Sequence, residues 1–287
     1  RYPERWQRFR DFTYRQIEEI VSGYGPLDIL WLDGGWVRPA PMVEIAPGHF
    51  VKNPKNMDID MPRIAAMARR HQPGLLVVDR TVTGRYENYR TPEQEVPEKP
   101  LPYAWETCMT MGDSWSYVPG DRYKPARRLV HLLVDVVSKG GNFLLNIGPS
   151  PEGEFAPEAL DRLREVGAWM KINGAAIYGT RPVAPYKEVK TCFTALPDGT
   201  VHAIYLADEG EEAPPAKIML TAIAPAPGSE VRMLGVREPV KWEKVGKGAL
   251  LTVPATAVAK PPCRYAWVFR FKPAPAPAAK AKEGAAR

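Results

Sequence analysis

The residues of this chain with the clearest potential for chemistry are carboxylates that follow short apolar runs. Asp33 comes directly after the run 27–32 and before two glycines and Trp36. Such a run, placed after a Gly-Pro pair, predicts a strand with Asp33 at its carboxyl-terminal tip. In barrels of alternating strands and helices, that rim carries the chemistry because its loops converge on one substrate. The alternative is that Asp33 only caps the turn that follows it.

Further polar residues fall on the same expected rim or on its loops. Arg80 follows a second apolar run, Glu93 lies in the long segment 81–104, and Glu106 comes just after that segment. The aromatic residues of this region are Trp36, Trp105, Trp115 and Tyr117. Two carboxylates beside aromatic faces suit glycoside hydrolysis, since one attacks or stabilises the anomeric carbon and the other protonates the leaving oxygen.

Each of these residues also has a purely structural interpretation. Glu106 could pair only with a neighbouring arginine, and Arg80 could hold only a loop carboxylate. An isolated Trp or Tyr at a strand end more often belongs to the core than to a site. The hypothesis of a site therefore depends on the residues occurring together.

The elements that must position these residues follow from periodicity. Apolar residues at helical spacing predict the helices 3–22, 61–71, 125–138 and 157–172. Short apolar runs predict the strands 27–32, 75–78, 104–110 and 142–147, and residues 37–60 are expected to form a loop. Strands that alternate with helices predict an α/β fold with a parallel sheet or barrel.

The pattern changes beyond Tyr178. Short β-rich runs occur at 201–206, 216–220, 231–234, 249–253 and 265–271, and Gly, Pro and charged residues separate them. Residues 179–273 are therefore predicted to form an antiparallel β-sandwich domain. Residues 274–287 are rich in Ala, Pro and Lys, which predicts a disordered tail.

Composition limits the classes of function. The chain has 287 residues, of which 45% are hydrophobic and 25% charged, enough for a sizeable core. It has no apolar run near the ~18 residues of a membrane span, so a membrane partner is not expected. Part of the net charge of +6 lies in the tail and the rest is interspersed with acids, so nucleic acid is not expected either.

Cofactor motifs are not evident in the sequence. Cys108, Cys192 and Cys263 are far apart and show no metal-ligand spacing. The Gly-Gly-Asn at 140–142 fits a helix end before a strand better than a phosphate loop. We therefore expect no metal and no nucleotide cofactor.

Seven short motifs follow one another between residues 24 and 178. They are YGPLDILWLDGGW at 24–36, VVDR at 77–80, YRTPEQ at 89–94, WETCMT at 105–110, SWSY at 114–117, GGNFLLNIGP at 140–149 and INGAAIY at 172–178. In this order they resemble the α-L-fucosidases of glycoside hydrolase family 29. The resemblance implies a retaining exo-glycosidase that releases terminal α-L-fucose through a covalent fucosyl-enzyme intermediate, on a (β/α) barrel followed by a β-sandwich.

The resemblance also implies roles for the carboxylates. Asp33 matches the family's catalytic nucleophile. Glu93 is the expected general acid/base, and Glu106, which follows a tryptophan in a better-preserved motif, is its rival. A retaining mechanism requires the two carboxyl groups to lie about 5–5.5 Å apart, whereas an inverting one requires about 6.5–9.5 Å.

The remaining site residues implied by the resemblance bind the substrate, a fucosylated glycan. Arg80 resembles an arginine that contacts the sugar or the nucleophile's surroundings, and Trp115 an aromatic that faces the sugar's methyl side. Trp36 and Glu106 are expected to bind substrate as well. The resemblance favours a periplasmic or extracellular protein, and the sequence does not predict an oligomeric state.

The chain departs from the family pattern in one respect. Family members carry upstream strands with a His-His pair, and the histidines here, His49, His71, His131 and His202, lie in no such motif. We therefore expect a fragment or a truncated homologue, with residues 1–178 as the carboxyl-terminal portion of a (β/α)8 barrel. Two alternatives stay open, a non-catalytic fucose-binding protein of the same fold and a retaining glycosidase for another sugar.

Overall fold

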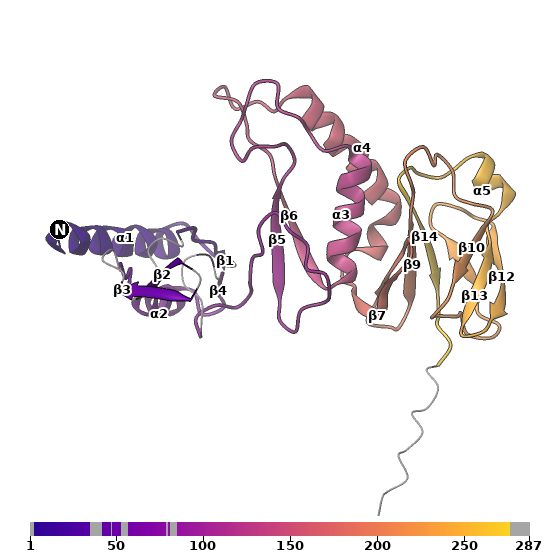
Figure 1. Ribbon diagram of the computed structural model, residues 1–287, viewed down its shortest axis with the longest axis horizontal. Coiled ribbons are helices and arrows are strands. Elements are labelled where there is room, and N and C mark those ends of the chain that lie inside the picture. Colours follow the sequence, from indigo (N-terminus) through magenta and orange to yellow (C-terminus); the bar gives the residue numbers. More distant parts are fainter. Residues whose placement is uncertain are drawn as a thin grey trace, which may run out of the picture. The chain divides into compact units, whose positions relative to one another are not determined.

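The computed structural model describes residues 3–34, 42–46, 48–52, 57–78, 80 and 85–275 (Figure 1). The chain divides into two compact units. The first comprises residues up to Glu93 together with Pro102–Glu106, and the second comprises Gln94–Leu101 together with the residues from Thr107 onward. The domain boundary expected at residue 178 stays a prediction. The tail expected at 274–287 lies, from residue 276 on, outside the described residues.

The first unit contains the first two predicted helices and the first two predicted strands. They are α1 (Pro3–Gly23), β1 (Ile29–Leu30), α2 (Met61–His71) and β4 (Leu76–Val77). Strands β1 and β4 pair in parallel, as expected for strands joined through a helix. Each is two residues long, shorter than the apolar run that predicted it.

The loop expected at 37–60 is in part a β-hairpin. Strands β2 (Met42–Ala46) and β3 (His49–Lys52) pair antiparallel across a turn in which Gly48 has φ 74°. The sequence of both strands contains β-branched or aromatic residues, which favour extended backbone, and glycine readily adopts a positive φ. The prolines around the hairpin hid this local signal.

The core of the first unit joins both helices to both strands. Ile17 and Val21 of α1 and Ile64 of α2 are buried with Leu30 and Val77 from the two strands. Burial of this apolar surface is the main force that holds β1 and β4 against the helices. The two strands thereby gain a fixed base for the polar residues that follow them.

In the second unit, two helices cover one face of a β-sheet. Helices α3 (Ala126–Ser138) and α4 (Pro157–Asn173) share a buried cluster with residues from three of its strands. The indole of Trp169 is 1% exposed, and its Nε1 donates a 2.9 Å hydrogen bond to the Ala266 carbonyl. Strand β5 (Trp105–Thr110), whose first two residues belong to the first unit, pairs with β6 (Gly141–Asn146) in a separate two-stranded sheet.

The sheet itself has eight strands in the order β10-β13-β12-β11-β14-β9-β8-β7, all paired antiparallel. They are β7 (Arg181–Glu188), β8 (Thr191–Ala195), β9 (Val201–Leu206), β10 (Lys217–Leu220), β11 (Val231–Met233), β12 (Pro239–Val245), β13 (Gly248–Thr252) and β14 (Ala266–Phe271). Strands β7, β8 and β12 and the short helix α5 (Ala255–Ala259) were not predicted.

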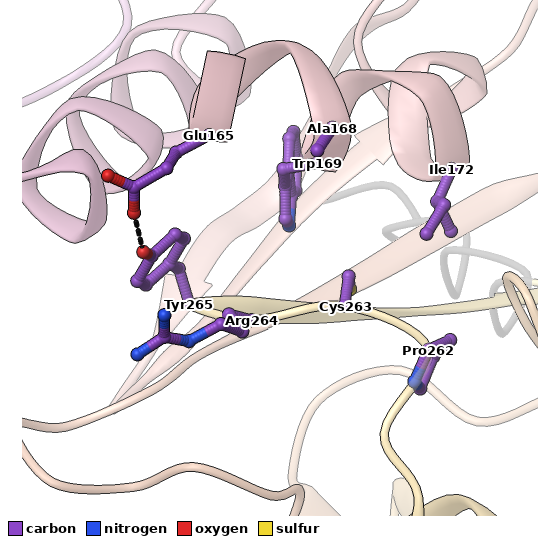
Figure 2. Close-up of a pocket in the computed structure, with 8 residues that line it drawn as sticks. All are labelled: Glu165, Ala168, Trp169, Ile172, Pro262, Cys263, Arg264 and Tyr265. Carbon is purple, nitrogen blue, oxygen red and sulfur yellow. Dashed lines mark hydrogen bonds between the residues drawn. The ribbon is translucent and has the colours of Figure 1, made fainter. Parts of the chain in front are cut away.

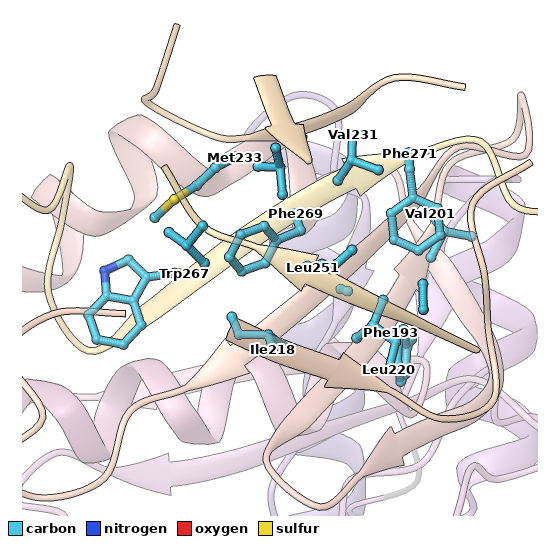
Figure 3. Packing of buried hydrophobic residues seen from close by; sticks show 14 of the residues in the cluster. Phe193, Val201, Ile218, Leu220, Val231, Met233, Leu251, Trp267, Phe269 and Phe271 are labelled. Carbon is cyan, nitrogen blue, oxygen red and sulfur yellow. The ribbon is translucent and has the colours of Figure 1, made fainter. Parts of the chain in front are cut away.

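The expected pair of packed sheets is here one continuous sheet that curls around a single core. Figure 3 shows Trp267, Phe269 and Phe271 of β14 packed among side chains from other strands of the sheet. The ends of the two edge strands are linked, because the Glu188 carboxylate of β7 accepts hydrogen bonds from the backbone N–H of Thr221 (2.8 Å) and of Ala222 (3.1 Å), just after β10. Alternating apolar residues fill the enclosed side.

None of the helices among the described residues is long and apolar enough to cross a membrane.

Candidate active site

Arg80 joins two of the carboxylates predicted from the sequence. Its Nη2 lies 3.3 Å from Asp33 Oδ1 and 2.6 Å from Glu93 Oε2. These two oxygens can therefore be no farther apart than the sum of both distances, about 5.9 Å. The Arg80 side chain is 18% exposed, whereas those of Asp33 and Glu93 are 55% and 39% exposed. The cation is thus largely covered while both carboxylates remain accessible to a ligand.

A tryptophan and a third carboxylate support this arginine. The Arg80 guanidinium carbon lies 5.2 Å from the centroid of the Trp31 ring, within range of a cation–π interaction. Trp31 Nε1 in turn donates a 3.2 Å hydrogen bond to Glu106 Oε1. Burial raises the pKa of Glu106, and the Trp31 hydrogen bond opposes that rise only in part. Glu106 is therefore linked to Arg80 through the indole.

Backbone pairing explains how residues distant in sequence come together. Strand β1 pairs with β4, Val78 forms a parallel bridge with Tyr89, and Arg90 forms a parallel bridge with Trp105. The second bridge is made by hydrogen bonds from Arg90 N to Ala104 O (3.0 Å) and from Glu106 N to Arg90 O (2.9 Å). Four segments thus run side by side in one direction. Their carboxyl ends meet at one edge, where polar side chains can converge.

The predicted site residues have three different outcomes. The contacts above bring together Asp33, Arg80, Glu93 and Glu106. Trp115 belongs to the second unit, where it is 41% exposed in the loop after β5. Trp36 lies outside the described residues.

Two of the structural alternatives can now be compared with the contacts. Arg80 does hold a loop carboxylate, that of Glu93, but it contacts Asp33 at the same time. In the described contacts Glu106 accepts a hydrogen bond from an indole, not from a neighbouring arginine. The polar residues therefore form one connected group.

The contribution of Trp31 was not predicted from the sequence. A signal was available, because side chains two residues apart in an extended segment point to the same face, and Trp31 is two residues before Asp33. Gln94 was also missed. Its backbone has φ 58°, a left-handed conformation that is uncommon for residues other than glycine, and no sequence pattern reports it.

The loop that carries Trp115 is held firmly within the second unit. The Asp121 carboxylate accepts hydrogen bonds from the backbone N–H of Asp113 (3.2 Å) and of Ser114 (3.4 Å). Close backbone packing adds to this, since a Cβ on Gly148 would lie 2.4 Å from Tyr117 N. Trp115 is therefore presented to solvent from an ordered loop.

A separate cavity of about 190 Å³ lies in the second unit between α4 and residues 262–265, where Figure 2 shows its lining. Trp169, Ile172 and Cys263 form much of the wall, and a hydrogen bond from the Tyr265 hydroxyl to Glu165 lies at one end. Burial raises the pKa of the Cys263 thiol, which disfavours a reactive thiolate. The lining offers no pair of carboxylates for glycoside chemistry.

Residues that could bind a metal ion are not grouped in the part of the chain that the structure describes. No cluster of three or more His, Cys, Asp or Glu side chains with that capacity occurs there.

Comparison with known proteins links this arrangement to one family. The family model described as alpha-L-fucosidase matches residues 1–175. An alpha-L-fucosidase of Branchiostoma floridae is 30% identical over 92% of this chain and 57% of its own length, and the plasma alpha-L-fucosidase of Rattus norvegicus is 34% identical over 90% and 55%. The chain spans a little over half the length of these curated relatives.

Solved structures give the same result. Alpha-L-fucosidase isoenzyme 1 from Paenibacillus thiaminolyticus superposes with a TM-score of 0.74 at 26% identity, covering 94% of this chain and 63% of that one. The Thermotoga maritima alpha-fucosidase in complex with fucose superposes with a TM-score of 0.72 at 28% identity, covering 92% and 56%.

Proposed function

The chain belongs to the alpha-L-fucosidase family, and on this premise we propose that it supplies the catalytic carboxylates of a retaining exo-glycosidase that releases terminal α-L-fucose from fucosylated glycans. The observation that carries the proposal is the shared contact of Arg80 Nη2 with Asp33 and Glu93. It brings one oxygen of each carboxylate within about 5.9 Å of the other, which supports the close pair of carboxyl groups that a retaining mechanism requires.

In the proposed mechanism Asp33 is the nucleophile. Its carboxylate oxygen forms a bond to the anomeric carbon of fucose while the bond from that carbon to the leaving oxygen breaks. Glu93 donates its proton to the leaving oxygen, so the aglycone departs as an alcohol. Glu93, now a carboxylate, then removes a proton from water, whose oxygen attacks the anomeric carbon and releases Asp33. Two inversions at one carbon give net retention.

Arg80 and the residues behind it keep the carboxylates in place. The guanidinium contacts both Asp33 and Glu93, and Trp31 supports it through its ring face. Glu106 fixes the indole by accepting the Nε1 hydrogen. We assign Glu106 this supporting role and not that of general acid, because its oxygen is engaged by Trp31 and Glu93 is the carboxylate that shares Arg80 with the nucleophile.

Two aromatic residues are also proposed to bind the sugar. Trp115, exposed in its ordered loop, and Trp36 are assigned to sugar binding on the basis of their motifs. An exposed indole offers a flat apolar face to the C–H groups of a sugar. The relatives named above are all fucosidases, which does not favour the alternative of a non-catalytic fucose-binding protein.

The fold proposed for residues 1–178 is the carboxyl-terminal portion of a (β/α)8 barrel. Its support is the parallel pair β1–β4, the two parallel bridges that extend it, and the convergence of polar residues at the carboxyl ends of these segments. The eight-stranded curled sheet follows this portion in the chain.

The test is hydrolysis of 4-nitrophenyl α-L-fucoside by the longest natural chain that contains these 287 residues, with the anomer of the first-formed fucose read by NMR. We expect retention, and Asp33→Ala should abolish turnover. The matched control is Asp28→Ala, at an exposed aspartate just before β1, which should remain active. First-formed product of inverted configuration would refute the mechanism, and fucose binding without turnover would favour the binding protein.

The acid/base assignment has its own test. Glu93→Ala should slow substrates with poor leaving groups most, and added azide should restore turnover of an activated aryl fucoside by replacing water without needing a base. Glu106→Ala should slow all substrates alike, because it loosens Trp31. If azide rescues Glu106→Ala and not Glu93→Ala, the two roles are reversed.

A further inference from the structure

We propose that Gln94 is a positioning residue that fixes the proposed general acid/base, Glu93, by clamping the chain to strand β5. The inference rests on the proposed function, since it assigns a task to the neighbour of Glu93. Gln94 makes three hydrogen bonds to β5. Its backbone N–H donates to Cys108 O (2.9 Å), its Nε2 donates to Thr110 Oγ1 (3.1 Å), and its Oε1 accepts from Thr110 N (3.3 Å).

The backbone of Gln94 shows that this arrangement is imposed. A φ of 58° places it in the left-handed region, where a residue with a side chain is strained. Such a conformation persists only when the surrounding contacts hold it, and the amide clamp supplies those contacts. Because Gln94 follows Glu93 directly, the direction in which the chain leaves Glu93 is set by this conformation.

The partner of the clamp is itself fixed. Thr110 is 1% exposed, its hydroxyl donates to Gly112 O (2.6 Å), and its carbonyl accepts from Lys124 Nζ (2.7 Å). One residue beyond Gln94, the carbonyl of Glu95 accepts from the Thr107 hydroxyl (2.6 Å). The segment after Glu93 is therefore fastened to a rigid strand at successive positions.

Support from the backbone matters for Glu93 because its own side chain is 39% exposed. A general acid must lie within hydrogen-bond reach of the leaving oxygen, and a misplacement of ~1 Å can cost on the order of 10²-fold in rate. A backbone that is fixed on the side of Gln94 reduces the range over which the carboxyl group moves.

The experiment uses the dependence of rate on the leaving group. Acid assistance matters for phenyl α-L-fucoside, because phenoxide is a poor leaving group. It matters little for 2,4-dinitrophenyl α-L-fucoside, whose leaving group needs no proton. For Gln94→Ala we expect kcat/KM to fall about 10- to 100-fold with the phenyl substrate and less than about threefold with the dinitrophenyl substrate. The ratio of the two values does not depend on the fraction of folded enzyme.

A second pair of variants tests the clamp from the side of β5. Thr110→Val removes the hydroxyl that accepts from Gln94 Nε2, and it should reproduce the selective loss. Thr110→Ser retains the hydroxyl and should restore the ratio of the original protein. If Gln94→Ala fails to fold, this pair of variants still tests the positioning role of Gln94.

The matched control is another glutamine that links two segments. Gln72 Nε2 donates to Val21 O (2.8 Å) and to Gly25 O (3.0 Å) in the first unit. Gln72→Ala should lower kcat/KM for both substrates by the same factor.

The failure of this inference differs from failure of the proposed function. Suppose that the enzyme hydrolyses fucosides and that Glu93→Ala loses acid assistance. If Gln94→Ala and Thr110→Val then lower kcat/KM equally for both substrates, the positioning role alone is overturned. A protein without fucosidase activity, or a Glu93→Ala variant without selective loss, would overturn the proposed function and the inference together.

Discussion

Replacement of His202 should change how the stability of the protein depends on pH. This histidine lies on β9, is 0% exposed, and neither of its ring nitrogens has a hydrogen-bond partner among the described residues. Burial lowers the pKa of His202 to about 4. The positive charge of Arg270, its neighbour on β14, also contributes to this lowering of the pKa, and the negative charge of Asp198 opposes it. The folded protein therefore holds this imidazole neutral where an unfolded chain would protonate it.

The sign and the size of this change in stability with pH follow from proton linkage. With a pKa near 4 in the folded state and ~6.5 in the unfolded state, the unfolded chain binds more protons below pH 6.5, so stability falls as pH falls. The loss begins near pH 6.5 and is complete below about pH 4. Between pH 8 and pH 5 it amounts to ~2 kcal/mol, since each unit of pKa difference is worth ~1.4 kcal/mol.

The assay is urea unfolding at pH 8 and pH 5 of the original protein and of His202→Leu, followed by tryptophan fluorescence. Leucine has no charge to gain, so the pH-dependent loss should be smaller in the variant by ~2 kcal/mol. Burial also lowers the pKa of His131, so this residue contributes to the acid sensitivity that the variant retains. Equal pH dependence in both proteins, or an NMR titration of folded His202 near pH 6.5, would refute the reasoning.

Four other substitutions test three separate parts of the structure. Arg80→Lys keeps the charge but loses the planar group that contacts two carboxylates and an indole, so kcat/KM for an aryl fucoside should fall by roughly 10- to 100-fold, whereas unchanged kinetics would show that the charge suffices. Gly148→Ala would place a Cβ 2.4 Å from Tyr117 N and should lower the free energy of unfolding by ~1–3 kcal/mol, and an unchanged stability would contradict the close approach. Its control, Gly167→Ala, lies at a helix position with open space and should raise the free energy of unfolding by ~0.5–1 kcal/mol. Glu188→Gln removes the charge of the carboxylate that accepts hydrogen bonds from two backbone N–H groups beyond β10. The midpoint of urea unfolding should fall slightly, and an unchanged midpoint would contradict a role for the charge.

Sequence patterns predicted the helices well because their apolar residues recur at helical spacing. Helix α2 was expected at 61–71 and spans Met61–His71, and α4 was expected at 157–172 and spans Pro157–Asn173. Strands were predicted less well. Runs such as 27–32 report burial on a face, but how much of a run becomes strand depends on how many neighbours pair with it. Within the described part of the chain, β1 pairs with β4 over two residues.

The candidate site likewise has features that the sequence predicted and features that it did not. Asp33, Arg80 and Glu93 could be proposed because polar residues after apolar runs are conspicuous in a sequence. That one arginine nitrogen contacts both carboxylates could not be predicted, since it depends on the bridges Val78–Tyr89 and Arg90–Trp105 that form between distant segments. The left-handed backbone of Gln94 was equally hidden, because tertiary contacts impose it against local preference.

The link between Glu188 and the residues after β10 has a consequence for self-association. Edge strands normally present unpaired N–H groups to which a strand of another molecule can add, and proteins in which these groups stay open tend to aggregate. Here the carboxylate of Glu188 occupies the N–H groups of Thr221 and Ala222, and it places a negative charge where an incoming strand would have to lie. A single side chain at the meeting point of both edges thus protects that corner of the sheet from intermolecular pairing.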